Sequence, residues 1–442
     1  MMSVQPRQVA ASKKRNMSQG PDSAGPANHM PPFFDIRMRG FRDRAEVAEV
    51  TALLTERLRP LPPEMVSLTE AAGRVLAQDV VSAVAVPAFD RAAMDGYALR
   101  AQETFGAGPY NPLEFQVAGE ALPARPFAGK LQASQAVRIM TGAPLPDGAD
   151  AVLQAEAAEE SDRRLRVSDA VPPGRNVGRR GEDIEKDSVV LHAGRVLRPQ
   201  DLGLLASIGV ASVALVRRPR VALLITGNEL LPCGSRPEGY RIIDSNSVML
   251  AALVRRDGGV PQQTTYVPDR ADAVEAALSG ADADVILVSG GSSVGKEDHA
   301  PSIVARLGEL PVHGVALRPA SPSGVGFLGG RPVFLLPGNP VSCLCAYDLF
   351  AGRAVRLLGG RSFDLPYATR TLPLGAKVSS AVGRMDYVRV RIVDDKAVPL
   401  AVSGASILST TTAADGFVLV PPDSEGYPAG QPVTVHLYDN PS

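Results

Sequence analysis

Residues 284–299 read DVILVSGGSSVGKEDH, in which a short apolar run is followed by a glycine turn and two acids. Residues 333–342 repeat the apolar run and the glycine turn, without the acids, because VFLL is followed by PGNPVS. Each apolar run has the length of a buried parallel strand, and the residues after each turn have a helical pattern. A glycine turn between a strand and a helix lets backbone amides approach an anion closely. The two turns therefore indicate a ligand with phosphate-like groups.

The acids near these turns suggest a metal as well as an anion. Glu297 and Asp298 follow the first turn, and an anion alone does not need them. A divalent metal that bridges a carboxylate and a phosphate accounts for both. For any single acid at a turn, a solvated turn or a helix cap is the interpretation that the residues alone favour. That alternative applies to Asp298 and also to Asp90, Asp95, Asp183, Glu229, Asp244 and Asp269.

Around the two turns, from Pro219 to about Gly360, strand patterns alternate with helical ones. The expected strands are VALLITG, QTTYV, DVILVSG, HGVALR and PVFLLPG. The expected helices are SNSVMLAALVRRDGG, ADAVEAALSG, APSIVARLGEL and PVSCLCAYDLFAGRAVRLL. This series predicts a parallel sheet with helices on both faces, and ligands bind beyond the carboxyl ends of such strands. TGNEL, residues 226–230, follows the first strand, so Glu229 is expected at the same edge.

The remaining chain divides into segments that differ in their helical and strand patterns. A disordered tail is expected at 1–40, an extended domain at 41–85 and 178–216, an inserted β domain at 86–177, the α/β domain at 217–362 and a small β barrel at 363–442. In the extended domain, VAEVTALLTERL and DLGLLASIG have helical patterns, and a capping box at 67–70 predicts another helix over AAGRVLAQDV. In the inserted domain, the expected strands are FQVAGE, AVRIMTG, AVLQAEA and RLRVSD.

Composition excludes several classes of protein. The chain has 442 residues, with 45% hydrophobic and 21% charged side chains, so it is expected to form several globular domains. The net charge of −1 gives no reason to expect nucleic-acid binding, and no apolar stretch has the length of a membrane span. The three cysteines provide no disulfide framework, and no signal peptide is evident, so a cytoplasmic protein is expected. Cys343 and Cys345 lie in an apolar run, which favours helix packing over chemistry.

Six motifs occur in the order found in one known family. They are AFDRAAMDGYALR, IMTGAPLPDGADAV, RRGEDI, TGNEL, SGGSSVGKED and LLPGNPVS. From about residue 45 to the C-terminus, the sequence resembles the molybdopterin molybdenumtransferase family, which is related to the gephyrin E domain. The resemblance implies a homodimer of four-domain subunits: an extended domain with a β insertion, an α/β domain that binds molybdopterin, and a β barrel. It also implies that molybdate is inserted into adenylylated molybdopterin with Mg²⁺, and that AMP is released.

The resemblance also implies roles for individual residues. It places a metal at Glu229, Asp269 and Asp298, and it places Asp90 and Asp183 in the cleft of the partner subunit. Arg318 and Arg384 would join Asp90, Asp183, Glu229 and Asp269 as catalytic residues near the anionic substrate. Substrate binding would involve Thr226, Gly290, Gly291, Ser292, Gly295, Pro337, Gly338, Asn339, Ser342 and Ser406. A molybdopterin adenylyltransferase and recipient molybdoenzymes are the expected further partners.

Several positions depart from the family pattern. The usual KPGKP is RPASP here, so Arg318 and Ser321 replace lysines, and Gly314 stands where some members have another lysine. TGDEL becomes TGNEL through Asn228, and Gly404-Ala405 replaces a Gly-Ser pair, with Ser406 as a substitute. A lost charge-assisted contact costs about 1–3 kcal/mol, enough to weaken anion binding by tenfold. Two interpretations follow: a working insertase, or a paralogue that binds molybdopterin or a partner enzyme as a delivery module. An adenylyltransferase fits less well, since it needs neither the β insertion nor the barrel.

Overall fold

The computed structural model describes residues 43–291, 298–401, 404 and 406–439. All of them belong to one compact unit of the chain, Ile36–Ser442. The expected disordered tail lies outside the described residues, and so do Ser292, Gly295 and Ala405. No helix in the described ranges is long and apolar enough to cross a membrane.

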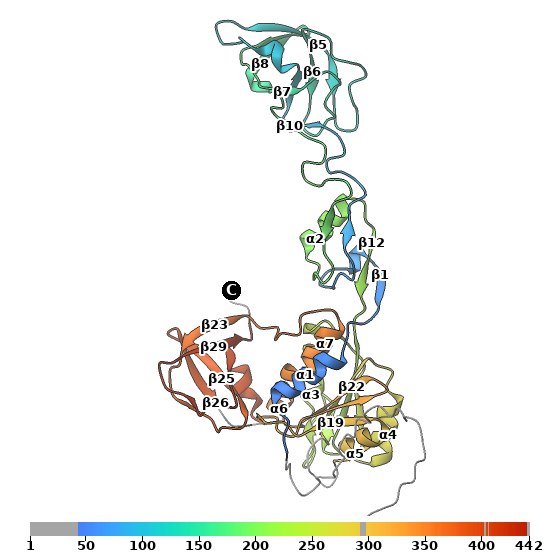
Figure 1. The fold of residues 1–442 in the computed structure, drawn as a ribbon, viewed down its shortest axis with the longest axis vertical. Coiled ribbons are helices and arrows are strands. Elements are labelled where there is room, and N and C mark those ends of the chain that lie inside the picture. Colours follow the sequence, from blue (N-terminus) through green and yellow to red (C-terminus); the bar gives the residue numbers. More distant parts are fainter. Residues whose placement is uncertain (1–42, 292–297, 402–403, 405, 440–442) are drawn as a thin grey trace, which may run out of the picture. The chain divides into compact units, whose positions relative to one another are not determined.

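A seven-stranded mixed sheet forms the centre of the α/β region (Figure 1). Its strand order is β16-β13-β18-β22-β21-β19, and β17 also pairs with β13. The parallel strands are β13 (Arg220–Thr226), β16 (Val260–Pro261), β17 (Thr265–Val267), β18 (Val285–Ser289) and β22 (Arg331–Leu336). β21 (Gly324–Leu328) and β19 (Glu309–His313) run antiparallel at one edge. The α/β class and a parallel-rich sheet are confirmed, with two antiparallel strands added at one edge.

The expected strand HGVALR, residues 313–318, is not a single strand. The edge strand β19 ends at His313, and Leu317–Arg318 forms a separate strand, β20, which pairs with the C-terminal sheet instead. Gly314, with a φ of 97°, turns the chain between the two strands. A glycine at this position adopts the left-handed conformation that a lysine would not readily adopt.

Helices cover both faces of the sheet, as predicted. They are α3 (Asn246–Arg256), α4 (Ala271–Gly280), α5 (Ala300–Leu307), α6 (Pro340–Ala346), a π-helical turn (Tyr347–Ala351) and α7 (Gly352–Leu358). Successive residues of β13 face opposite sides: Leu223 packs in the cluster with α3, α6 and α7, and Leu224 packs in the cluster with α4 and α5. Cys343 and Cys345 of α6 are fully buried in the first of these clusters, which confirms a packing role. Burial also raises the pKa of the Cys343 thiol to about 12.

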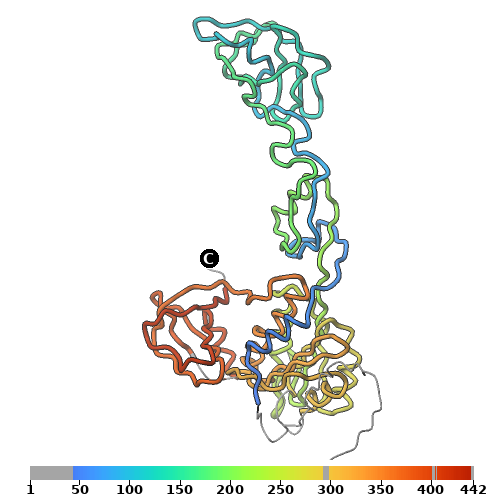
Figure 2. The backbone as a smooth tube through the Cα atoms, in the orientation of Figure 1, coloured from blue at the N-terminus to red at the C-terminus, as the bar shows by residue number. Residues whose placement is uncertain are grey.

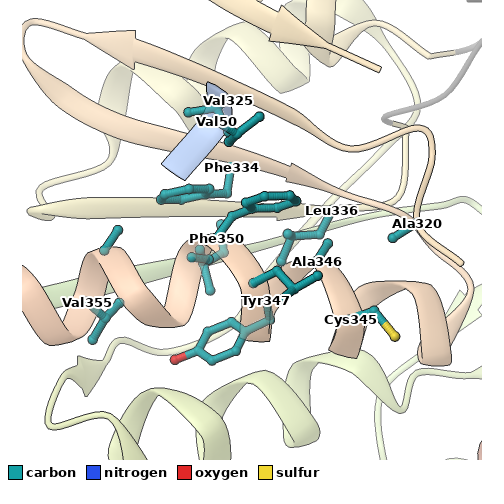
Figure 3. Close-up of a cluster of buried hydrophobic side chains, with 14 of the residues drawn as sticks. Val50, Ala320, Val325, Phe334, Leu336, Cys345, Ala346, Tyr347, Phe350 and Val355 are labelled. Carbon is teal, nitrogen blue, oxygen red and sulfur yellow. The ribbon is translucent and has the colours of Figure 1, made fainter. Parts of the chain in front are cut away.

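The first helix, α1 (Val47–Arg57), belongs to this core although the sequence places it in the extended domain. Its residues Val50 and Leu54 are fully buried in the cluster that contains the sheet and α6. Figure 3 shows Val50 beside Val325 and Phe334. The bounds of the domains stay a prediction, but α1 shares its buried surface with the α/β sheet.

The extended region is formed by two segments far apart in the sequence. Figure 2 follows the backbone out along residues 63–92 and back along 177–216. β1 (Pro63–Ser67) pairs with β12 (Ser212–Val216), and β2 (Val80–Val81) pairs with β11 (Val189–Leu191). The expected helix α2 (Pro199–Ser207) is present.

The helix predicted over AAGRVLAQDV is wrong. Ser67 does accept a hydrogen bond from the Thr69 amide, but only a 3-10 turn, Leu68–Glu70, follows. Gly73 then adopts a φ of 72°, which interrupts a right-handed helix. The backbone of Val75 and Leu76 forms bridges to Val196 and Leu215. These long-range bridges, which the local pattern does not contain, hold the segment extended.

The inserted region contains the β structure that was predicted. Its six-stranded sheet has the order β7-β4-β6-β5-β9-β8. The strands are β4 (Gly96–Leu99), β5 (Leu113–Ala121), β6 (Gln135–Ile139), β7 (Ala151–Gln154), β8 (Ala158–Ser161) and β9 (Arg164–Val167). β3 (Arg91–Ala92) pairs with β10 (Val177–Gly178), and 3-10 turns lie at Ala101–Thr104 and Ala155–Ala157.

The C-terminal region is rich in strands, as expected. Its main sheet has the order β20-β25-β27-β29-β23, with β26 paired to β25. The strands are β23 (Thr369–Pro373), β25 (Met385–Val393), β26 (Lys396–Ala401), β27 (Gly416–Val420) and β29 (Pro432–Leu437), and β24 (Val378–Ser379) pairs separately with β28 (Gly426–Tyr427). The expectation of strands alone is wrong, because α8 (Leu408–Thr412) is a short helix.

Candidate functional site

A cavity of about 840 Å³ lies at the carboxyl ends of β13, β18 and β22. It is the edge at which parallel strands place ligand-binding turns. Ten of the residues predicted from the sequence line it: Thr226, Glu229, Asp269, Gly290, Gly291, Asp298, Pro337, Gly338, Asn339 and Ser406. We call it the glycine-turn cavity.

The glycines of the first turn are required by close packing. Gly290 and Gly291 have φ values of 90° and 56°. A side chain at Gly290 would place its Cβ 2.3 Å from the carbonyl oxygen of Thr226, and one at Gly291 would lie 2.8 Å from the Thr226 hydroxyl. The second turn is adjacent, because a Cβ at Gly338 would lie 3.6 Å from the Cα of Gly290. Backbone from the two turns therefore meets at one wall of the cavity.

The start of α3 supplies cavity residues that the sequence did not identify as site residues. The Nδ2 of Asn246 donates to the Gly338 carbonyl at 2.8 Å and to the Ser289 hydroxyl at 2.9 Å, so it ties both turns together. Asp244 accepts hydrogen bonds from the amide of Asn246 at 2.9 Å and from the hydroxyl of Tyr266 at 3.0 Å. The only local signal is the run DSNS at 244–247, which precedes a helix and is typical of a cap.

Two buried polar atoms at this cavity have no hydrogen-bond partner among the described residues. They are the Oγ1 of Thr226 and the Oδ1 of Asn246. The orientation of the Asn246 amide is determined by Gly338, because a carbonyl only accepts and the nitrogen must face it. A buried polar group without a partner costs about 1–3 kcal/mol, so folded proteins keep few of them. These two atoms could form hydrogen bonds to a polar ligand in the cavity.

The three acids predicted to hold a metal, Glu229, Asp269 and Asp298, line the glycine-turn cavity together with Asp244, but they are not preassembled. Asp269 accepts the amide hydrogen of Asn228 at 2.8 Å, and Asn228 Oδ1 accepts the amide hydrogen of Asp269 at 3.3 Å. Among the described residues, no group of three acidic, histidine or cysteine side chains is close enough to hold a metal. Mg²⁺ is usually held by one or two carboxylates, waters and substrate phosphates. Glu229, Asp269 and Asp298 fit that mode of binding rather than a closed protein cage.

A second cavity, of about 340 Å³, shares Pro322, Pro337 and Asn339 with the first. Its polar lining includes Arg318, Ser321, Ser342 and Arg384, and we call it the arginine cavity. Arg318 forms an ion pair with the fully buried Asp386, and the Nε of Arg384 lies 3.4 Å from the same carboxylate. The Ser321 hydroxyl is buried without a partner among the described residues. Arg318 and Arg384 thus share one carboxylate, and Arg44, which also lines the cavity, adds a third guanidinium group.

Asp90 and Asp183 are not brought to either cavity of this chain. Both are exposed, and they lie on neighbouring stretches of backbone near the base of the inserted region. Asp90 accepts the amide hydrogen of Arg180 at 2.8 Å, and the Asp183 amide donates to the Val86 carbonyl at 3.1 Å. Their expected contribution to a partner subunit's cleft stays a prediction.

Family models match almost the whole of the described chain. Residues 45–209 match "MoeA N-terminal region (domain I and II)", residues 222–356 match "Probable molybdopterin binding domain", and residues 371–438 match "MoeA C-terminal region (domain IV)". A molybdopterin molybdenumtransferase 2 of Mycobacterium tuberculosis is 36% identical over 401 residues, 88% of this chain and 98% of that protein. The chain belongs to the MoeA family.

Other members of the MoeA family agree with this assignment. A molybdopterin molybdenumtransferase of Haemophilus influenzae is 32% identical, over 86% of this chain and 95% of that protein. Two crystal structures of the MoeA protein from Pyrococcus horikoshii have TM-scores of 0.80 and 0.76, at 32% identity, and cover 90% of this chain and 100% of theirs. The family resemblance found in the motifs is therefore confirmed.

Proposed function

We propose that this MoeA family member inserts molybdenum from molybdate into adenylylated molybdopterin and releases AMP, with Mg²⁺. The observation that carries the proposal is the wall shared by the two cavities, at Pro322, Pro337 and Asn339. One cavity has two glycine turns and four acids, which suit a phosphorylated ligand with a metal. The other has three arginines, Arg44, Arg318 and Arg384, which suit an oxyanion. Two substrates bound on either side of one wall would lie next to each other.

Each set of residues has a task in this reaction. The backbone amides at Gly290, Gly291 and Gly338 would hold the phosphate groups in place. Glu229, Asp269 and Asp298 would hold Mg²⁺, which supplies positive charge at the phosphate that is cleaved. Arg318 and Arg384 would bind molybdate, and Asp386 would hold their guanidinium groups at the wall. The unpaired Thr226 and Asn246 atoms would hydrogen-bond the bound substrate.

We further propose that the protein acts as a homodimer in the cytoplasm. Asp90 and Asp183 would then complete the glycine-turn cavity of the second subunit. A molybdopterin adenylyltransferase would supply the substrate, and molybdoenzymes would receive the product. A monomer found by light scattering of the purified protein would contradict the shared cleft.

The direct test is to measure AMP release from adenylylated molybdopterin by the purified full-length chain. Reactions with and without molybdate, and with and without Mg²⁺, form the four arms. Release that needs both supports the insertase. Tight substrate binding without release in any arm would overturn it and support a delivery module.

A further inference from the structure

The helix that follows the second glycine turn is not a uniform α-helix. It runs from Pro340 to Leu358 through α6, a π-helical turn and α7, and the π-helical turn spans Tyr347–Ala351. A π-helical turn is rare and is often found at functional positions. This one contains Asp348, whose side chain is fully buried. A buried carboxylate is costly unless several partners compensate it.

The partners of Asp348 come from three different parts of the chain. Arg256, the last residue of α3, donates to Asp348 at 2.9 Å. Tyr367, in the segment between α7 and β23, donates at 2.9 Å. Tyr387, in the barrel strand β25, donates at 3.3 Å. Burial raises the pKa of Asp348, and Arg256 opposes that shift by favouring the charged carboxylate.

The strand β25 connects Asp348 to the arginine cavity. Arg384, which lines that cavity, directly precedes β25, and Asp386, the partner of Arg318, lies within it. The neighbouring side chain of Tyr387 reaches Asp348 on the other face of the strand, because adjacent strand residues point to opposite faces. Two consecutive residues of one barrel strand therefore bond in two directions: Asp386 to Arg318 in the neighbouring strand β20, and Tyr387 to Asp348 in the α/β region.

The barrel side of this junction is itself tightly organised. The Tyr387 ring stacks on Phe417 with ring centres 4.0 Å apart and an interplanar angle of 13°. Its hydroxyl also lies 2.9 Å from the hydroxyl of Tyr438. A displacement of Tyr387 would therefore move β25 as a unit, together with Arg384 and Asp386.

We propose that Asp348 is a positioning residue for the anion end of the active site. It lines neither cavity, so it acts through Tyr387 and β25, which carry Arg384 and Asp386 to the wall beside Arg318. The proposal rests on the proposed function, in which the arginine cavity takes molybdate. It does not require that Asp348 touches a substrate.

The test uses two variants of the full-length chain, Asp348→Asn and Tyr387→Phe. Tyr387→Phe keeps the ring that stacks on Phe417 and removes only the hydroxyl that reaches Asp348. In both variants we expect the KM for molybdate to rise about tenfold, the range of one hydrogen bond to a charged group. The affinity for adenylylated molybdopterin is expected to change less than about twofold, since the glycine turns do not depend on β25.

Asp284→Asn provides a matched control. Asp284 forms a mostly buried ion pair with Arg217 at 2.8 Å in the same α/β region, and it lines neither cavity. Its loss is expected to lower the melting temperature while the ratio of the two substrate affinities stays that of the wild type. A purely structural role for Asp348 would give the same result as this control.

Each outcome supports or overturns the proposal. An unchanged molybdate KM in Tyr387→Phe, or an equal loss for both substrates, overturns it even if Asp348→Asn fails to fold. If the wild type does not insert molybdenum, the proposed function fails, and calorimetry with molybdate alone then decides the positioning role: weaker binding by Tyr387→Phe supports it. If the wild type does not bind molybdate either, the arginine cavity is not an anion site and both proposals are wrong.

Discussion

The glycine-turn cavity and the arginine cavity share a wall but are built in different ways. Much of the first is lined by the turns that follow neighbouring strands of one sheet, so that part of its shape follows from local sequence. The second depends on Arg318 from β20 and on Arg384 beside β25, which are brought together by strand pairing across 68 residues of sequence. Distant contacts add to the local frame of the first cavity, because Asn246 bonds to Gly338 across 92 residues. The second depends on contacts between distant segments.

The largest effect is expected from the removal of a proposed metal ligand in the glycine-turn cavity. Asp298→Ala is expected to lower Mg²⁺-dependent AMP release by about a hundredfold or more, because a metal ligand is lost at the phosphate. Circular dichroism is expected to show an unchanged fold. Asp272→Ala, which removes an exposed acid paired with Arg270, is the control. Full activity in Asp298→Ala would exclude a metal role for this residue.

A glycine substitution tests whether the backbone shapes that cavity. Gly290→Ala places a Cβ against the Thr226 carbonyl at a φ of 90°, and it is expected to cost about 1–3 kcal/mol of unfolding free energy and to weaken substrate binding. Gly203→Ala, in the exposed part of α2, meets no atom within 4 Å and is expected to stabilise the protein by about 0.5–1 kcal/mol. Urea denaturation measures both variants. Equal effects would contradict the close packing.

An added positive charge tests whether the arginine cavity binds an anion. Ser321→Lys restores the family's usual residue beside Arg318 and Arg384, and it is expected to lower the KM for molybdate by about tenfold through one charge-assisted contact. Lys396→Arg, a conservative change in β26, is the control. An unchanged KM would mean that Arg318 and Arg384 already provide the charge that the anion needs.

The smallest expected effect is on the pH dependence of stability, through one histidine of the C-terminal barrel. Burial lowers the pKa of His436, whose ring stacks on Phe417 with centres 4.9 Å apart. A depressed pKa means that stability is present above the unfolded value of about 6.5 and is lost as the pH falls through the folded value. The melting temperature is therefore expected to decrease when the pH is lowered from about 6. His436→Gln is expected to reduce this dependence on pH. His192→Gln changes an exposed histidine and is the control.

The same contrast explains which features the sequence predicts. The turns after Ser289 and Leu336 are local, so the residues that line the glycine-turn cavity could be named from strand patterns and glycines. Asn246 was missed because its role comes from Gly338, 92 residues further along the chain. The helix predicted over AAGRVLAQDV failed because Val75 and Leu76 form bridges to residues about 120 to 140 positions away. Local patterns do not contain such pairings, and the same holds for the pairing of β20 with β25.

The position of α1 in the α/β core affects how the chain is made. Val50 packs with Phe334, which lies far along the chain. Because synthesis runs from the N-terminus, α1 leaves the ribosome long before this partner is made. At about 5–20 residues per second, the apolar face of α1 waits on the order of tens of seconds for that core. Nascent chains stalled before Phe334 are expected to show α1 open to proteases, and protection at that stage would contradict this order. The inserted β region has its strands between residues 96 and 167 and can pair them during that interval, so the middle of the molecule is expected to fold before its beginning.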